Sequence, residues 1–289
     1  MGGVEVSRAS LHNQSEIDKK DIRVGDRVLI ERAGDVIPQV VKPIKEVRTG
    51  NEKKFEMPEN CPICGVKVIT SADKKQTTCP NTNCRAQIVG RIVHFSSRNA
   101  TNIEGLGDKI AQQLFESGLV RKLSDIYKLK IEDLTALEKF AEKSGENLLD
   151  WIEKSKNVTF PKFLYGLGIP QVGEHVAWVI AQKYGLEGLK KATQSELENI
   201  HEIGPEIAQQ VVGFFSTNEN LEMLDEFAEL GVKISETKNN ETGNKLEGLS
   251  FVFTGELENL TREEAKELVV ENGQSLIRHH SSNTNYVVV

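Results

Sequence analysis

The chain has 289 residues, of which 38% are hydrophobic, and a formal net charge of −7. Several small modules, each with its own core, fit this length better than one domain. Because an acidic protein repels phosphate at long range, this charge argues against bulk electrostatic attraction to nucleic acid, although local backbone amides escape that objection.

The hydropathy pattern argues against a membrane or secreted protein. The sequence has no run of 18 apolar residues, and its first residues lack the basic and apolar regions of a signal peptide. We therefore expect a cytoplasmic protein without a membrane span. In that compartment cysteines are more often metal ligands than disulfide partners.

Two β-rich runs lie near the N-terminus. Residues 28–32 and 36–41 flank the turn sequence Ala33-Gly34-Asp35. This arrangement predicts a hairpin or two sharply bent strands. Any small β-barrel produces the same pattern, so these runs alone identify no particular fold.

All four cysteines lie within 24 residues, as two close pairs: Cys61 with Cys64, and Cys79 with Cys84. Four thiolates complete the tetrahedral shell of Zn²⁺ and leave no position for water, which predicts a structural site rather than a catalytic one. Residues 66–70 between the pairs predict a strand. Metal binding worth roughly 10–16 kcal/mol would fold this short segment. Disulfides are the alternative, and His94 is expected to pack or to lie on the surface.

A nine-residue pattern of aliphatic and small residues occurs four times. The copies start at Ile103, Leu137, Ile169 and Ile200, and a helical run follows each one. Their starts are 34, 32 and 31 residues apart. Such a period predicts repeated helical units that bury one another's apolar faces.

The fifth position of the pattern carries the chemistry. It is Gly107, Gly173 and Gly204 in copies one, three and four, where a turn enters a helix and we expect a backbone conformation closed to other residues. The first helical N–H groups then point outward as a site for phosphate oxygen. This is typical of the helix-hairpin-helix motif, which holds nucleic-acid backbone without reading bases. Copy two has Ala141 instead and is expected to pack more than to bind; an ordinary αα-hairpin is the alternative for any single copy.

The C-terminal part reads as a linker followed by a small α/β unit. Residues 235–245 are polar and predict a flexible linker. Residues 249–255 predict a strand and turn, Thr261 to Glu264 form a capping box before a helix, and residues 286–289 predict a last strand. We expect a truncated α/β domain.

In this order the modules resemble the C-terminal half of a bacterial NAD-dependent DNA ligase. The most specific pieces are Val6 to Asn13, Asp21 to Asp26 and Arg32 to Pro38, which resemble the OB domain of that family. The resemblance implies a multi-domain fold with these parts: a partial OB-fold barrel at 1–57, a four-cysteine zinc finger at 58–86, an all-α helix-hairpin-helix domain with four repeats at 87–234, a linker at 235–245 and a partial BRCT-like α/β segment at 246–289.

The resemblance also implies a function. Such ligases seal nicks in duplex DNA during replication and repair: a lysine in a Lys-x-Asp-Gly motif takes AMP from NAD and passes it to the 5′-phosphate, and the 3′-hydroxyl then displaces AMP. This chain contains no Asp-Gly dipeptide. We therefore expect no catalytic or NAD-binding residue here and no ligation by this chain alone. Structural Zn²⁺ is its expected cofactor, whereas NAD and Mg²⁺ belong to the full-length enzyme.

The implied partners are nicked double-stranded DNA and an N-terminal adenylation domain, for a monomeric, nucleoid-associated bacterial protein. The candidate DNA contacts are Arg27, Arg32 and Lys42 in the OB part, and Gly105, Gly107, Gly173, Gly204, Lys109 and His175 at the hairpins. For each of the basic side chains, the alternative interpretation is a solvent-exposed position without a DNA contact. Thr254 and Gly255 match a turn that holds phosphate in some BRCT relatives, but are expected to be structural here. A freestanding zinc and helix-hairpin-helix DNA adaptor without catalysis is the alternative function, and a purely structural protein is a weaker third.

Overall fold

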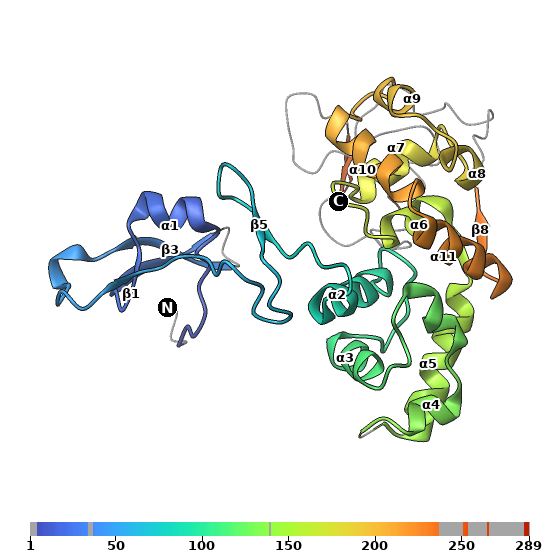
Figure 1. Ribbon diagram of the computed structural model, residues 1–289, viewed down its shortest axis with the longest axis horizontal. Coiled ribbons are helices and arrows are strands. Elements are labelled where there is room, and N and C mark those ends of the chain that lie inside the picture. The colour runs from blue at the N-terminus through green and yellow to red at the C-terminus, as the bar shows by residue number, and fades with distance from the viewer. Residues whose placement is uncertain are drawn as a thin grey trace.

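The computed structural model describes residues 5–33, 37–138, 140–236, 251–253, 265 and 286–288. In Figure 1 a small β lobe and a larger helical domain stand apart, with the cysteine-rich segment between them. The described part of the chain therefore consists of several small units.

The β lobe is built on the predicted hairpin. Its elements are α1 (Gln14–Lys20), β1 (Arg23–Val24), β2 (Val28–Ala33), β3 (Ile37–Pro43), the 3-10 helix η1 (Lys45–Val47) and β4 (Lys53–Lys54). Strands β2 and β3 pair antiparallel with a bulge after Leu29, and β1 pairs antiparallel with β4. The hairpin prediction is confirmed.

The core of this lobe is very small. Its buried apolar side chains are Ile17, Ile22 and Val40. Large apolar side chains remain exposed across the lobe, namely Leu11, Val24, Leu29, Ile37, Ile44, Val47 and Met57. Among the described residues only four partly buried apolar side chains, Ala9, Val28, Ile30 and Phe55, pack against the three buried ones, and a core this small gives little stability by itself. The lobe thus has apolar surface that its own residues do not cover.

The cysteine-rich segment contains two short strands, β5 (Ile69–Thr70) and β6 (Thr77–Thr78), which pair antiparallel. The predicted strand at 66–70 is thus shorter than expected, because only an isolated bridge between Asn60 and Lys67 precedes it.

The helical domain has one continuous core. Its elements are α2 (Arg85–Phe95), α3 (Asp108–Glu116), η2 (Leu123–Lys128), α4 (Ile131–Thr135), α5 (Glu142–Ser155), β7 (Asn157–Thr159), α6 (Phe160–Gly166), α7 (Glu174–Ala181), α8 (Leu186–Leu189), α9 (Gln194–Glu198), α10 (Pro205–Phe215), α11 (Asn218–Glu229) and β8 (Lys233–Ser235). Strands β7 and β8 pair in parallel, a contact that the sequence did not suggest. Phe227 packs against the rings of Phe95, Tyr127 and Phe163 at the centre.

The repeated aliphatic positions are core positions. In copies one, three and four the first, fourth and ninth residues are all buried: Ile103, Leu106, Ala111, Ile169, Val172, Ala177, Ile200, Ile203 and Ala208. All belong to the same hydrophobic core. The repeat is therefore a packing pattern first, because each unit buries its apolar face against its neighbours.

Two further strands, β9 (Phe251–Phe253) and β10 (Tyr286–Val288), pair in parallel. Thr254, Gly255 and the capping box at 261–264 lie outside the described residues. Among the helices that the structure describes, the longest has 14 residues, and none has the length and apolar content needed to cross a membrane.

Candidate nucleic-acid interface and metal centre

In all four hairpins a hydrogen-bonded turn is followed directly by a helix. The first and fourth residues of each copy are joined by a turn hydrogen bond, 3.4 Å from Leu106 N to Ile103 O in copy one and 3.0–3.3 Å in the others. A helix begins after the fifth residue, which is its N-cap: Gly107 for α3, Ala141 for α5, Gly173 for α7 and Gly204 for α10. The sequence thus located each helix start correctly.

The predicted backbone conformation of the N-cap glycines is wrong. Gly107, Gly173 and Gly204 have φ of −94°, −81° and −82°, which any residue adopts. The left-handed residue lies two positions earlier, as Gly105 (φ 89°), Gln171 (φ 67°) or Glu202 (φ 74°). It is the third residue of the turn, where a positive φ is needed to bring the chain back toward the helix. Only Gly105 could have signalled this position from the sequence.

Packing does not explain the N-cap glycines either. A Cβ built on Gly107, Gly173 or Gly204 meets no atom within 4 Å. None of the three helix starts has a side-chain cap, whereas Thr193 caps α9 and Asn13 caps α1. Neither strain nor crowding therefore requires glycine. We call these three positions the glycine corners; each leaves the first amides of a helix open to a close ligand.

Copy two differs in its packing. A Cβ on Gly145, its ninth residue, would lie 2.7 Å from Ile131 Cδ1. This glycine allows α5 to approach α4 closely, which agrees with the expectation that copy two contributes to packing. Its N-cap, Ala141, is exposed.

The predicted basic residues are exposed but do not form one surface. Lys109 is exposed on the first turn of α3. On the β lobe, Lys42 stands opposite Leu29, and Arg27 is exposed just before β2. Arg32 follows Leu29 by three residues, so it points to the other face of the hairpin. His94 is half-buried and its Nε2 lies 2.8 Å from Tyr165 O, which confirms a packing role.

His175 does not stand free at the start of α7. Its Nε2 contacts the Glu202 carboxylate across two hairpins, and its ring stacks on Trp178 with centroids 6.3 Å apart. The sequence did not reveal this pair, because 27 residues separate its members.

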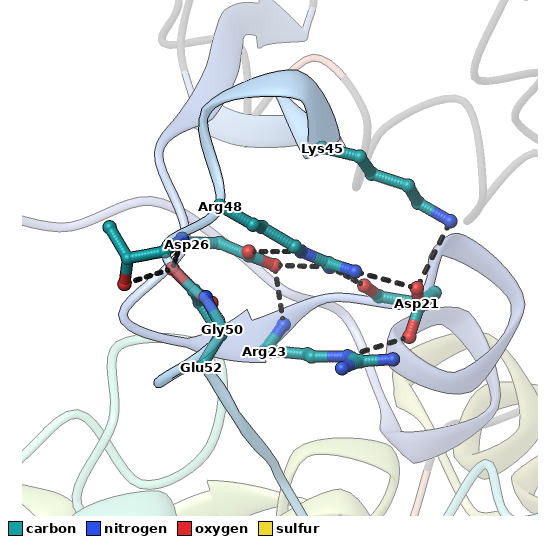
Figure 2. Close-up of polar contacts among 8 residues, drawn as sticks. Asp21, Arg23, Asp26, Lys45, Arg48, Gly50 and Glu52 are labelled. Atoms are coloured by element: carbon teal, nitrogen blue, oxygen red, sulfur yellow. Dashed lines mark hydrogen bonds and ion pairs between the residues drawn. The ribbon is translucent and has the colours of Figure 1, made fainter.

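An ion-pair cluster that the sequence also missed holds the β lobe together (Figure 2). The Arg48 guanidinium donates to Asp26 Oδ1 at 2.7 Å and to Asp21 Oδ2 at 2.9 Å, and Lys45 and Arg23 also reach Asp21. The Asp26 side chain is only 1% exposed. Arg48 holds the pKa of Asp21 and of Asp26 below the ordinary carboxyl value. Asp21 and Asp26 therefore have a structural role in this lobe, because both carboxylates bind the Arg48 guanidinium.

The four cysteines form one compact cluster. All are free thiols, and their sulfurs lie within 4.8 Å of one another. The distances are 3.9 Å between Cys61 and Cys84 and 3.5 Å between Cys64 and Cys79. Tetrahedral zinc with bonds of about 2.3 Å places its sulfurs about 3.8 Å apart. The cluster therefore fits a metal ion, whereas a disulfide needs about 2.05 Å.

The electrostatics of the cluster favour a cation. The backbone N–H of Val66 donates to Cys64 and lowers the pKa of that thiol to about 6. Burial raises the pKa of Cys79 to about 12. Because adjacent sulfurs resist ionising together, a bound cation supplies the charge that lets all four become thiolates.

The four-cysteine cluster contacts the helical domain directly. Cys84 is the N-cap of α2 and is 1% exposed. Arg91, further along α2, donates to Thr82 O in the second cysteine turn. On the other side, Lys74 pairs with Asp18 of α1 at 3.1 Å. The segment therefore contacts the β lobe through the turn between β5 and β6, and it contacts α2 through its second cysteine turn.

Family models match three parts of the chain. The NAD-dependent DNA ligase OB-fold domain matches residues 1–52, a SAM-like helix-hairpin-helix tandem matches residues 97–154, and a helix-hairpin-helix motif matches residues 162–224. The two helical matches contain copies one and two, and copies three and four, respectively.

Whole-chain comparison finds similar proteins named DNA ligase. That of Salinibacter ruber is 48% identical over the whole chain and 42% of its own length. Those of Desulfosudis oleivorans and Legionella pneumophila are each 45% identical over the whole chain and 43% of their own length. The chain thus spans less than half the length of these relatives. Over its whole length it is similar to part of these DNA ligases, and its first 52 residues match the OB-fold domain of the NAD-dependent enzymes.

Proposed function

We propose that this chain is the DNA-holding part of an NAD-dependent ligase that seals nicks in duplex DNA. The observation that supports this most is the set of three glycine corners, which are open, unstrained and uncapped. Helix N-termini of this kind bind phosphate through backbone amides and the helix dipole. Such contacts position a duplex without reading its sequence. They also explain how a chain with a net charge of −7 holds DNA, because the attraction is local.

The proposed modules follow the boundaries expected from the sequence: OB at 1–57, zinc finger at 58–86, helix-hairpin-helix domain at 87–234, linker at 235–245 and BRCT-like segment at 246–289. The parallel pairing of β9 with β10 supports an α/β unit at the C-terminus, because parallel strands need a crossover connection. Cys61, Cys64, Cys79 and Cys84 hold a structural zinc ion that keeps the DNA-binding parts in a defined arrangement.

The chemistry of sealing is assigned to another part of the enzyme. The β lobe exposes seven apolar side chains, and such a surface suits contact with another domain. We propose that the adenylation domain, with its lysine, NAD and Mg²⁺, packs there and receives a nick that this chain holds in place. Arg27 and Lys42 contribute phosphate contacts from the β lobe, and Lys109 from α3. The proposed setting is the bacterial nucleoid.

Aspartate at the three glycine corners tests the proposal, because it separates DNA binding from folding. The corners already have the backbone angles of an aspartate N-cap, and a Cβ at each meets no atom within 4 Å. Asp at an N-cap accepts hydrogen bonds from the first helical amides and stabilises a helix by a few tenths of a kcal/mol over Gly. The same carboxylate occupies the phosphate site and repels the ligand.

The triple variant G107D/G173D/G204D is therefore expected to melt at or above the wild-type temperature and to lose duplex retention on a filter. Losing roughly 1 kcal/mol or more at each corner gives on the order of a hundredfold weaker Kd. The matched control is Ala141→Asp, which makes the same cap in copy two and should leave Kd nearly unchanged. Unchanged retention in the folded triple variant would favour a purely structural role for the hairpins.

A second experiment separates a ligase part from a freestanding adaptor. The chain is mixed with a separately made adenylation half from a relative, NAD, Mg²⁺ and a nicked duplex. Sealing that requires both halves supports the ligase assignment, and DNA binding without any sealing supports the adaptor.

A further inference from the structure

One carboxylate stands between two of the glycine corners. Glu202 lies two residues before Gly204, in the turn of copy four, and it contacts His175, the second helical residue after Gly173. His175 lies on the first turn of α7, directly after the Gly173 corner, and helical side chains lean toward the N-terminus of their helix. The pair thus joins the two corners through one acidic side chain.

The backbone of Glu202 is strained for a residue of its type. Its φ of 74° is in the left-handed region, which costs roughly 1 kcal/mol for a residue with a Cβ. The equivalent residue of copy one is Gly105, which adopts a φ of 89° without this cost. Glycine would therefore be the relaxed choice at position 202, as it would be at Gln171 of copy three, which has a φ of 67°.

Fold stability does not account for the pair. The side chains of His175 and Glu202 are 52% and 47% exposed, and ion pairs this exposed contribute little to folding. The buried residues Val172 and Ile203 of the same two hairpins already fix their relative position within the shared core. The effect of the pair is therefore electrostatic and acts at the surface.

We propose that Glu202 is a built-in competitor of DNA phosphate. In the free protein its carboxylate contacts Nε2 of His175, and this contact must break before a duplex phosphate accepts a hydrogen bond from the same nitrogen. The proposal rests on the phosphate-binding function proposed above for the glycine corners. Glu202 then weakens the grip of hairpins three and four and speeds the release of duplex.

The other groups near the pair agree with this role. His201 is 97% exposed, and its Nδ1 lies 4.0 Å from Glu202 Oε1, so the same carboxylate stands beside a second imidazole. Glu174, next to His175, is already engaged, because it accepts a hydrogen bond of 2.8 Å from Asn99. Glu202 is thus the acid in direct contact with His175, and the stacked Trp178 ring holds that imidazole in place.

The test is a binding series on a fluorescent nicked duplex with the whole chain. Glu202→Gln removes the charge and keeps the shape, and the chain itself shows that glutamine suits this turn position, because Gln171 adopts it in copy three. Glu222→Gln is the matched control: it removes one negative charge from an exposed position on α11, a helix that begins no repeat. His175→Gln and the double variant E202Q/H175Q complete a cycle.

We expect E202Q to bind about fivefold more tightly than both wild type and E222Q at low salt, which is about 1 kcal/mol. The gain should appear as slower dissociation and should shrink at high salt because salt screens exposed charges. It should also vanish in the H175Q background. Equal affinities for E202Q and E222Q, or weaker binding by E202Q, overturn the inference while leaving the proposed function intact. Absence of DNA binding by wild type and every variant overturns both.

Discussion

Removing metal from the cysteine cluster is expected to unfold residues 58–84 and to leave the helical domain folded. Within this segment, which the structure describes throughout, the buried apolar side chains are Cys61 and Cys84. The segment therefore has no core apart from the metal ligands. Zinc contributes roughly 10–16 kcal/mol to the folding of such modules. A whole typical domain is stable by about 5–15 kcal/mol. The remaining contacts of this segment therefore cannot replace the free energy of metal binding.

The structure also says where unfolding should stop. Ile88, Ile92 and Phe95 of α2 are buried in the core of the helical domain, so α2 should survive beyond its first turn even when its N-cap, Cys84, is released. Hydrogen–deuterium exchange before and after chelation measures this directly. Peptides from 58–84 should exchange fully, and those from 88–95 should keep their protection. DNA affinity should fall, because the segment no longer holds the β lobe and the helical domain in a defined arrangement.

A variant series controls for the chelator. Cys84→Ser should reproduce the exchange pattern, whereas Thr77→Ser, a small change in β6 of the same segment, should not. Elemental analysis must show about one zinc per chain before treatment and none after it. A zinc-free protein that keeps its protection over 58–84, with a disulfide detected by mass, would refute the metal site.

Two further predictions concern the helical domain. Gly145→Val should lower the stability of this domain by about 1–3 kcal/mol, because a Cβ there lies 2.7 Å from Ile131 Cδ1. The control is Gly90→Val, which should not lower it, because a Cβ at Gly90 meets nothing within 4 Å. Equal melting temperatures of the two variants would contradict the packing argument. The ammonium of Lys122, with its neighbours, lowers the pKa of Glu226 to about 2 from an ordinary 4.5. Because this folded-state pKa is depressed, the stability that Glu226 contributes is present above pH 4.5 and is lost as the pH falls toward 2. The wild-type melting temperature should therefore fall more steeply in that window than that of Glu226→Gln, and parallel curves would show that the contact adds nothing.

Features set by short stretches of chain were predictable from the sequence. The cysteine cluster follows from pairs that are three and five residues apart, and the repeated units follow from aliphatic spacing that matches buried helix faces. The hairpin at β2 and β3 follows from a turn between two β-rich runs. In each case neighbours in sequence make the contacts, so a local pattern is enough.

Contacts between distant segments were not predictable. Arg48 binds Asp26 and Asp21, which precede it by 22 and 27 positions in the sequence. Strand β7 pairs with β8, which follows it by more than 70 residues. The sequence also placed the left-handed turn residue two positions too late. Glycine is compatible with many conformations, so its presence alone does not say whether φ, packing or a ligand requires it.

The sequence by itself determined the hairpin of the β lobe, the clustering of the four cysteines and the starts of the hairpin helices, because each depends on residues close together in the chain. Only the tertiary structure decided that the three glycine corners are open and that Glu202 reaches His175. The exposure of a helix start and the charges that surround a side chain depend on which distant segments pack nearby. A local sequence pattern contains no information about those segments.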